Sequence, residues 1–162
     1  MDETPSADDN HYMGLALAQA RLAQSRGEVP VGAVLVNESG QVIGEGANHV
    51  IGLSDPTAHA EVLALRAAGQ QQQNYRLPQT TLFVTLEPCA MCLMALFHAR
   101  VARIVYGAAD PKTGACGSRV DLTTQGVLNH HATVQGGVLD EACGQVLSDF
   151  FKARRSGDLS TG

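Results

Sequence analysis

The sequence predicts an α/β protein in which helices pack in layers around one mixed β-sheet. Apolar, β-branched runs alternate along the chain with segments in which alanine and leucine recur at helical spacing. The first two strand-like runs are joined by a short turn, residues 38–40, which indicates an antiparallel hairpin. Later strands are joined through helices, which adds crossover connections to the sheet. The length of 162 residues fits a single domain.

The expected elements begin with a helix over residues 12–26. Leu15, Ala18 and Leu22 recur there at helical spacing, and Gly27 is a stop signal.

The hairpin comes next, with strands over residues 29–36 and 41–48. Thr57 can cap a helix over residues 58–68, and residues 70–73 read as a polar loop.

Two helices, the first of them Pro-initiated, and three further strands complete the expected sheet and its cover. Pro88 suits the first position of a helix because it has no N–H to leave unpaired. The remaining elements are a strand (80–86), the helix from Pro88 to about residue 100, a strand (101–106), a glycine-containing loop (110–118), a short strand (133–136) and a last helix (139–155).

The two ends of the chain differ from its middle. Residues 1–10 are acidic and are expected to form a flexible tail before a domain over residues 11–156, with a second flexible tail over 157–162. The start lacks the basic and apolar segments of a secretory signal, and no apolar run is long enough to cross a bilayer. These features predict a cytoplasmic protein with no membrane partner.

The net charge of −5 does not by itself indicate a nucleic-acid partner. Its distribution leaves that partner open, because four of the 16 acidic residues lie in the first ten positions. Seven of the 11 basic residues fall from Arg100 onward. A local basic face and an ordinary solvated helix face explain this charge equally well.

Two short motifs carry the chemistry: His59-Ala60-Glu61 and the P-C-x-x-C segment that contains Cys89 and Cys92. Cysteines three positions apart at a helix start place both sulfurs on one face, and the N–H groups of a first turn favour thiolate. Zinc prefers such N and S donors, and three protein ligands leave a position open for water, as in catalytic zinc sites. His59, Cys89 and Cys92 are therefore the predicted ligands.

Glu61 is predicted to transfer protons. A bound zinc lowers the pKa of its water to about 7, and one carboxylate can serve as base and then as acid. The alternatives are a packing or redox pair for the two cysteines, and a first-turn partner of the helix dipole for Glu61.

The motifs identify a resemblance that extends over residues 10–156. H-x-E and P-C-x-x-C are typical of zinc nucleobase deaminases. Seven blocks resemble the bacterial tRNA-specific adenosine deaminases of the cytidine and deoxycytidylate deaminase superfamily: EVPVGAVLV (28–36), GEGAN (44–48), DPTAHAEVLALR (55–66), NYRL (74–77), TLEPCAMC (85–92), DPKTGACGS (110–118) and LSDFFKARR (147–155).

The resemblance implies a cytidine-deaminase-like fold, a three-layer α/β/α sandwich around a five-stranded mixed sheet, assembled as a homodimer. It implies one Zn²⁺ per chain, a tRNA anticodon stem-loop as partner, and hydrolytic deamination of adenosine to inosine at the wobble position. The implied substrate-binding residues are Asn48 on the nucleoside, Val31, Leu86 and Pro88 around the base, Asp110 and Lys112 on the nucleotide or anticodon loop, and Phe150, Phe151, Lys152 and Arg154 on the last helix.

Three alternatives remain at this point. At least one of Phe150 and Phe151 is expected to pack in the core rather than bind RNA. A deaminase of free cytosine, guanine or deoxycytidylate would carry the same zinc motifs. A non-catalytic, zinc-stabilised RNA-binding module would require a fourth protein ligand, for which the candidates are His98, Cys116 and Cys143.

Overall fold

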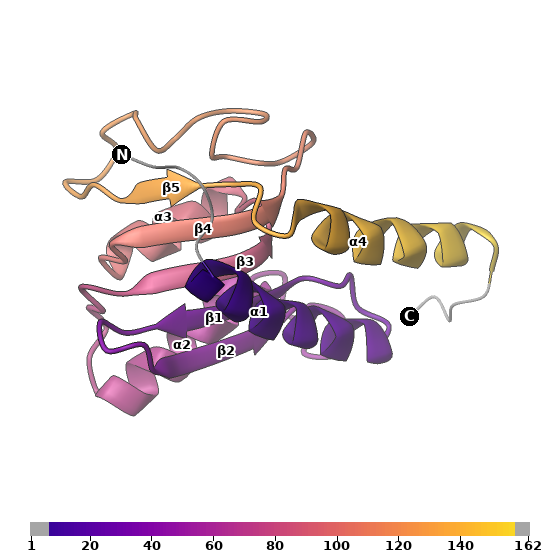
Figure 1. The fold of residues 1–162 in the computed structure, drawn as a ribbon, viewed down its shortest axis with the longest axis horizontal. Coiled ribbons are helices and arrows are strands. Elements are labelled where there is room, and N and C mark those ends of the chain that lie inside the picture. The colour runs from indigo at the N-terminus through magenta and orange to yellow at the C-terminus, as the bar shows by residue number, and fades with distance from the viewer. Residues whose placement is uncertain (1–6, 158–162) are drawn as a thin grey trace.

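A computed structural model describes residues 7–157 of the chain. Helices and strands alternate through most of it (Figure 1). Their bounds are α1 (Ala7–Ser25), β1 (Gly32–Val36), β2 (Val42–Ala47), α2 (Ala60–Gln72), β3 (Thr81–Leu86), α3 (Ala90–His98), β4 (Arg103–Ala108), β5 (Thr133–Gln135) and α4 (Asp140–Arg155).

The strands form one five-stranded mixed sheet in the order β2-β1-β3-β4-β5. β1 pairs antiparallel with both β2 and β3, whereas β3 with β4 and β4 with β5 are parallel pairs. The hairpin and the crossovers predicted from the sequence are therefore both present, and the five-stranded sheet implied by the family resemblance is confirmed.

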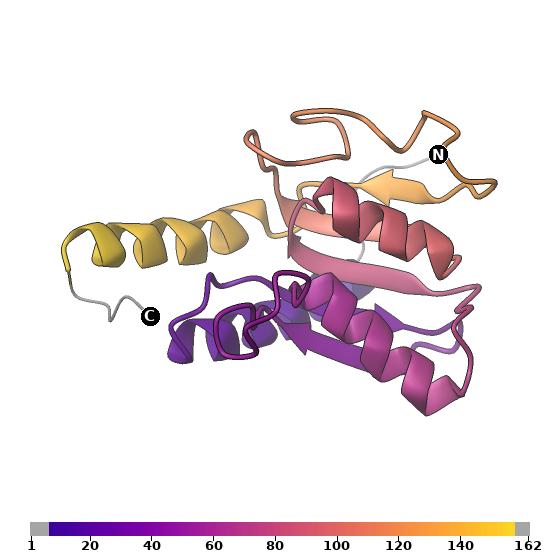
Figure 2. The same ribbon diagram turned by 180° about the vertical axis from the view of Figure 1, so that it is seen from behind.

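Helices cover both faces of the sheet and make three layers. α1 and α4 lie on the face seen in Figure 1, and α2 and α3 lie side by side on the opposite face in Figure 2. Alternate residues of β1 serve the two cores: Ala33 and Leu35 pack on the α2/α3 side, and Val34 and Val36 pack on the α1/α4 side. Such two-sided burial explains why β1 is apolar throughout.

Glycines on β2 allow α2 to lie directly against the sheet. A Cβ atom at Gly44 would overlap the backbone of Ala64, and one at Gly46 would overlap the backbone of Ala60. This close approach fixes the start of α2, and with it the position of Glu61 in its first turn.

The first helix begins earlier than the sequence indicated. Residues 7–10 were expected in the flexible tail, but α1 starts at Ala7. The buried carboxylate of Asp9 accepts bidentate hydrogen bonds of 2.8 and 2.7 Å from the guanidinium of Arg103 on β4. An ion pair of this geometry holds the first turn of α1 on the sheet, which corrects the predicted boundary. Residues 1–6 and 158–162, in the two predicted tails, lie outside the described residues.

The predicted loop over residues 70–73 is also corrected, because α2 continues to Gln72. Glutamine is a good helix former, so the polar run extends the helix. The chain leaves the helix at Gln73, which has a left-handed φ of 54° and donates its N–H to the Gly69 carbonyl.

No helix within residues 7–157 is both long enough and apolar enough to cross a membrane.

Candidate metal centre and active site

The metal motif lies where the first turns of two helices meet. His59 is the N-cap of α2 and Cys89 is the N-cap of α3, both in extended backbone conformations. Neither side chain caps its own helix, although a side-chain cap is typically worth about 1 kcal/mol. Both side chains, with Cys92 from the first turn of α3, instead face one another.

The geometry of this cluster fits zinc. The Nδ1 atom of His59 lies 3.7 Å from the Cys89 sulfur and 3.4 Å from the Cys92 sulfur. Zn–S bonds of about 2.3 Å and Zn–N bonds of about 2.0 Å at a tetrahedral angle require an N···S distance of about 3.5 Å. Within residues 7–157, no fourth His, Cys, Asp or Glu joins the cluster. The site could therefore hold one ion and leave one coordination position free.

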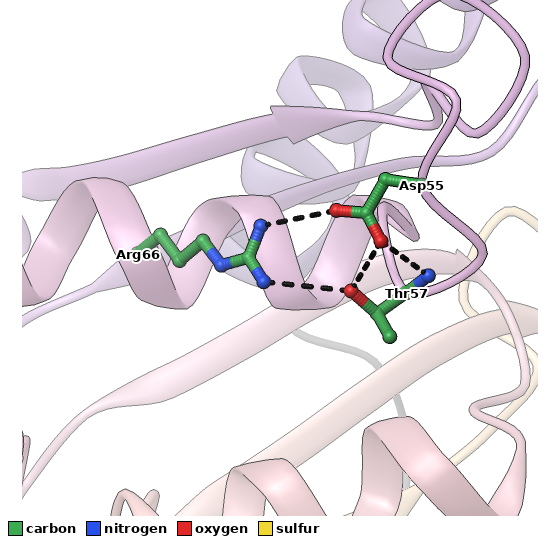
Figure 3. A network of polar contacts seen from close by, with 3 residues as sticks. All are labelled: Asp55, Thr57 and Arg66. Carbon is green, nitrogen blue, oxygen red and sulfur yellow. Dashed lines mark hydrogen bonds and ion pairs between the residues drawn. The ribbon is translucent and has the colours of Figure 1, made fainter.

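The turn before His59 is held by its own polar contacts, shown in Figure 3. Asp55 Oδ1 accepts hydrogen bonds from the Thr57 N–H (2.9 Å) and hydroxyl (2.7 Å), and these contacts lower the pKa of Asp55. Arg66 of α2 reaches back to both residues at 3.5 and 3.4 Å. Thr57 was expected to cap α2; its hydroxyl serves this turn instead, and His59 takes the N-cap position.

The two thiols are electrostatically distinct. A hydrogen bond from Cys92, together with one from His59, lowers the pKa of Cys89 to about 4. Donating that hydrogen bond, together with burial, raises the pKa of Cys92. The pKa of His59 is raised, chiefly by its hydrogen bond to Cys89. The N–H groups at the starts of α2 and α3 also favour negative charge here, so this position suits a cation with thiolate ligands.

Glu61 lies in the first turn of α2 and is 4% exposed. Burial raises the pKa of Glu61 to about 7. A carboxyl group that gains and loses a proton near neutral pH is suited to general acid–base catalysis. Its position beside the cluster, without being one of the three clustered ligands, matches the role predicted from the sequence.

A cavity of about 280 Å³ opens beside the metal cluster, with His59, Glu61 and Cys89 in its wall. This volume lies near the lower end of small-molecule sites, so it suits a nucleobase better than a complete nucleotide. The other residues that line it are Val29, Val31, Asn48, Val50, Ala60, Leu86, Glu87, Asp110 and Thr113.

Asn48 lines this cavity and has an unsatisfied buried polar atom. Its side-chain Nδ2 donates to the Val29 carbonyl at 3.2 Å, which orients the amide. Its Oδ1 atom is buried and has no hydrogen-bond partner. Buried acceptors without a donor are uncommon and indicate a missing partner. A ligand with an N–H or O–H group would satisfy it.

The structure brings only some of the predicted substrate residues to the cavity. Val31, Asn48, Leu86 and Asp110 line it. Pro88 is buried, is not among the lining residues, and accepts the Ala115 N–H at its carbonyl (2.9 Å), so its place beside the base stays a prediction. It also precedes α3 rather than beginning it.

Lys112 is exposed near the cavity but is not part of its lining. Its N–H donates to Asp110 Oδ1 at 3.0 Å.

The residues of the last helix lie on α4, which projects past the end of the sheet and contributes nothing to the cavity lining (Figures 1 and 2). Phe150 is 1% exposed, which agrees with the expectation that at least one of the two phenylalanines packs in the core. Its ring meets that of Phe151 edge-on and lies under the Arg154 guanidinium. Phe151 (40% exposed) and Lys152 remain accessible.

Several residues of the cavity wall were not predicted from the sequence. Val29 and Ala60 lie in the EVPVGAVLV and DPTAHAEVLALR blocks but had no predicted role of their own, and Val50 lies outside every block. Glu87 and Thr113 belong to the TLEPCAMC and DPKTGACGS blocks. The family resemblance rested on these blocks, but it assigned no site role to either residue.

Fold and site together define a zinc deaminase of the cytidine deaminase class, and comparison with known proteins agrees. The family profile of the cytidine and deoxycytidylate deaminase zinc-binding region matches residues 6–108. A tRNA-specific adenosine deaminase from Haemophilus influenzae is 52% identical over 147 residues, which are 91% of this chain and 85% of that protein. The chain belongs to the tRNA-specific adenosine deaminase family, as the sequence blocks indicated.

Solved structures show the same relationship. One, from a study of A-to-I editing by tRNA:A34 deaminases at the wobble position of transfer RNA, matches with a TM-score of 0.82 and 44% identity, covering 85% of this chain and 99% of that one. A guanine deaminase from Nitrosomonas europaea matches with a TM-score of 0.75 and 26% identity, over 91% of this chain and 85% of that one.

The division between metal binding and proton transfer can be tested with two variants. We expect Glu61→Gln to keep about one zinc per chain and its fold, because the three ligands remain, but to lose at least about 10³-fold in turnover with the proton acceptor gone. Cys89→Ala should lose the zinc. Metal analysis and single-turnover rates measure both effects, with Glu45→Gln, an exposed change on β2, as the matched control. Near-normal turnover by Glu61→Gln would assign the proton transfer to another group.

Proposed function

We propose that this protein converts adenosine to inosine at the wobble position of a tRNA anticodon. The observation that carries the proposal is a three-ligand metal cluster, open on a base-sized cavity with Glu61 in its wall, in a member of the tRNA-specific adenosine deaminase family. In this proposal His59, Cys89 and Cys92 hold the zinc.

The reaction replaces the amino group of adenine with oxygen from water and releases ammonia. Zinc, when bound, supplies an activated water molecule at neutral pH. Glu61 takes the protons of the attacking water and delivers one to ring nitrogen N1 and one to the departing amino nitrogen, so that a single carboxyl group serves as base and then as acid. Its buried position excludes competing solvent protons.

The cavity wall orients the base. Val31 and Leu86 offer apolar surface to the ring, and the free Oδ1 of Asn48 accepts a hydrogen bond from the substrate. A ligand that lacks the matching donor would leave this buried oxygen unpaired. Such a loss discriminates between ligands more strongly than apolar contact alone. Asn48 is thus the specificity contact in this proposal.

A base can reach this recessed site only when it is turned out of its stack, as in the single-stranded loop of an anticodon. Exposed cations and an exposed aromatic ring suit the flanking nucleotides, because cations neutralise phosphates and rings stack on bases. The exposed residues that would do this are Lys112, Phe151 and Lys152, and the half-buried Arg154, which lies over the Phe150 ring, would join them.

Two other functions were open from the sequence. A free-base deaminase is favoured by the similarity to a guanine deaminase, although at much lower identity than the tRNA deaminases. A non-catalytic RNA-binding module would need a fourth metal ligand, and His98, Cys116 and Cys143 are all outside the cluster. Burial raises the pKa of both Cys116 and Cys143 to about 12, which keeps them protonated.

A synthetic anticodon stem-loop with a wobble adenosine distinguishes these functions. We expect the zinc-loaded protein to form inosine in this RNA, while free adenosine, guanine and cytosine react at least about 100-fold more slowly in kcat/KM, since only the RNA offers contacts outside the cavity. Nucleoside analysis after digestion measures the product. A stem-loop with guanosine at the wobble position is the matched control. Faster reaction of a free base would establish the alternative enzyme.

We also propose a cytoplasmic homodimer. The cytoplasmic location follows from the proposed tRNA substrate, and the dimer follows from the family resemblance. Apolar side chains exposed in the single chain support a partner surface, among them Ile51, Leu53 and Met91. Sedimentation equilibrium should give twice the mass of 17.0 kDa, and a monomeric mass at micromolar concentration would contradict the dimer.

A further inference from the structure

Glu87 is a buried acid that neither the metal cluster nor the proposed proton transfer uses. It follows β3 directly, two residues before Cys89, and is 2% exposed. Its Oε1 accepts the Asp110 N–H at 3.0 Å, and its Oε2 accepts the N–H groups of Cys116 (2.9 Å) and Ser118 (3.2 Å). The Ser118 hydroxyl also donates to Oε1. Every donor comes from one loop, residues 110–118.

Through these hydrogen bonds the Glu87 carboxylate holds the loop in place. Burying a carboxylate is costly unless hydrogen bonds replace its water, and here four donors do so. Gly114 leaves room for it, because a Cβ at that position would overlap the Glu87 carboxyl group. The Ala115 N–H, which donates to the Pro88 carbonyl, adds a backbone tie from the loop to the same segment.

The loop so held is part of the cavity. Asp110 and Thr113 line it, and Asp110 accepts the Thr113 N–H (3.2 Å) and hydroxyl (2.8 Å), so the two residues form one rigid turn. The position of this wall relative to the metal cluster therefore depends on the short segment from Glu87 to Cys89.

We propose that Glu87 is a positioning residue that holds residues 110–118 as the substrate-facing side wall of the cavity. It binds no metal and transfers no proton. Its substitution should therefore weaken substrate binding more than it slows the chemical step. This inference rests on the proposed function for its kinetic part only.

An amide cannot replace the carboxylate. In Glu87→Gln, one of the two terminal atoms becomes an NH₂ group. At the Oε1 position that group would meet the Asp110 N–H, and at the Oε2 position it would meet the N–H groups of Cys116 and Ser118. Either orientation places donor against donor, although the side chain keeps its size.

The test compares Glu87→Gln with the native holoenzyme by three measurements. Amide exchange followed by NMR should accelerate roughly tenfold or more at Asp110, Cys116 and Ser118, with the amides of β1 unchanged, because hydrogen bonds to a charged acceptor are lost locally. Zinc should remain at about one per chain. With the stem-loop RNA, KM should rise roughly tenfold while kcat stays within about threefold.

Two further variants separate positioning from a general loss of stability. Asp9→Asn makes the same acid-to-amide change at a buried site on the opposite face of the sheet, and it should leave KM and the loop amides unchanged. Ser118→Ala removes only the hydroxyl donor and should produce a smaller shift in the same direction as Glu87→Gln.

Unchanged exchange at the three amides, loss of zinc, or a fall in kcat with constant KM would each overturn the proposal. Exchange and zinc content are measured without substrate. They therefore decide the positioning role even if the native protein were to leave the stem-loop unmodified, which would count against the proposed function alone.

Discussion

The whole site depends on one constraint, which is that two helices start at the same point. His59 and Cys89 are the N-caps of α2 and α3, and their metal-binding atoms lie 3.7 Å apart although the two residues are 30 positions apart in sequence. The sheet positions both helices: α2 packs closely against the glycines of β2, and β3 leads into α3 through a short segment. The helix N-termini then favour the thiolate form that a metal requires.

The buried carboxylates around this centre have two different roles. Glu61 faces the cavity, and burial brings its pKa to about 7. Glu87 and Glu28 face backbone N–H groups instead: Glu28 accepts those of Ile51 (3.1 Å) and Gly52 (2.8 Å) in the loop that leads to His59. Glu61 can thus exchange protons, whereas Glu87 and Glu28 hold two loops near the metal cluster in place through hydrogen bonds.

The chemistry was readable from the sequence because its residues lie in two compact motifs, and β1 was readable because burial on both faces makes it apolar. Other features depend on contacts between distant parts of the chain. The start of α1 is set by Arg103, 94 residues from Asp9. Thr57 loses the N-cap because Asp55 engages its hydroxyl. Which of the two adjacent phenylalanines is buried depends on how α4 packs against the sheet. The role of Glu87 depends on its contacts with residues 110–118, which the sequence does not reveal.

X-ray absorption at the zinc edge of the loaded protein tests the central claim most directly. Two thiolates, one imidazole and one solvent position predict two sulfur atoms at about 2.3 Å and two nitrogen or oxygen atoms at about 2.0–2.1 Å. A shell with three or four sulfur atoms, or with a second imidazole, would mean that a fourth side chain closes the site. Zinc would then serve only to stabilise the fold, and the site would have no position for the attacking water.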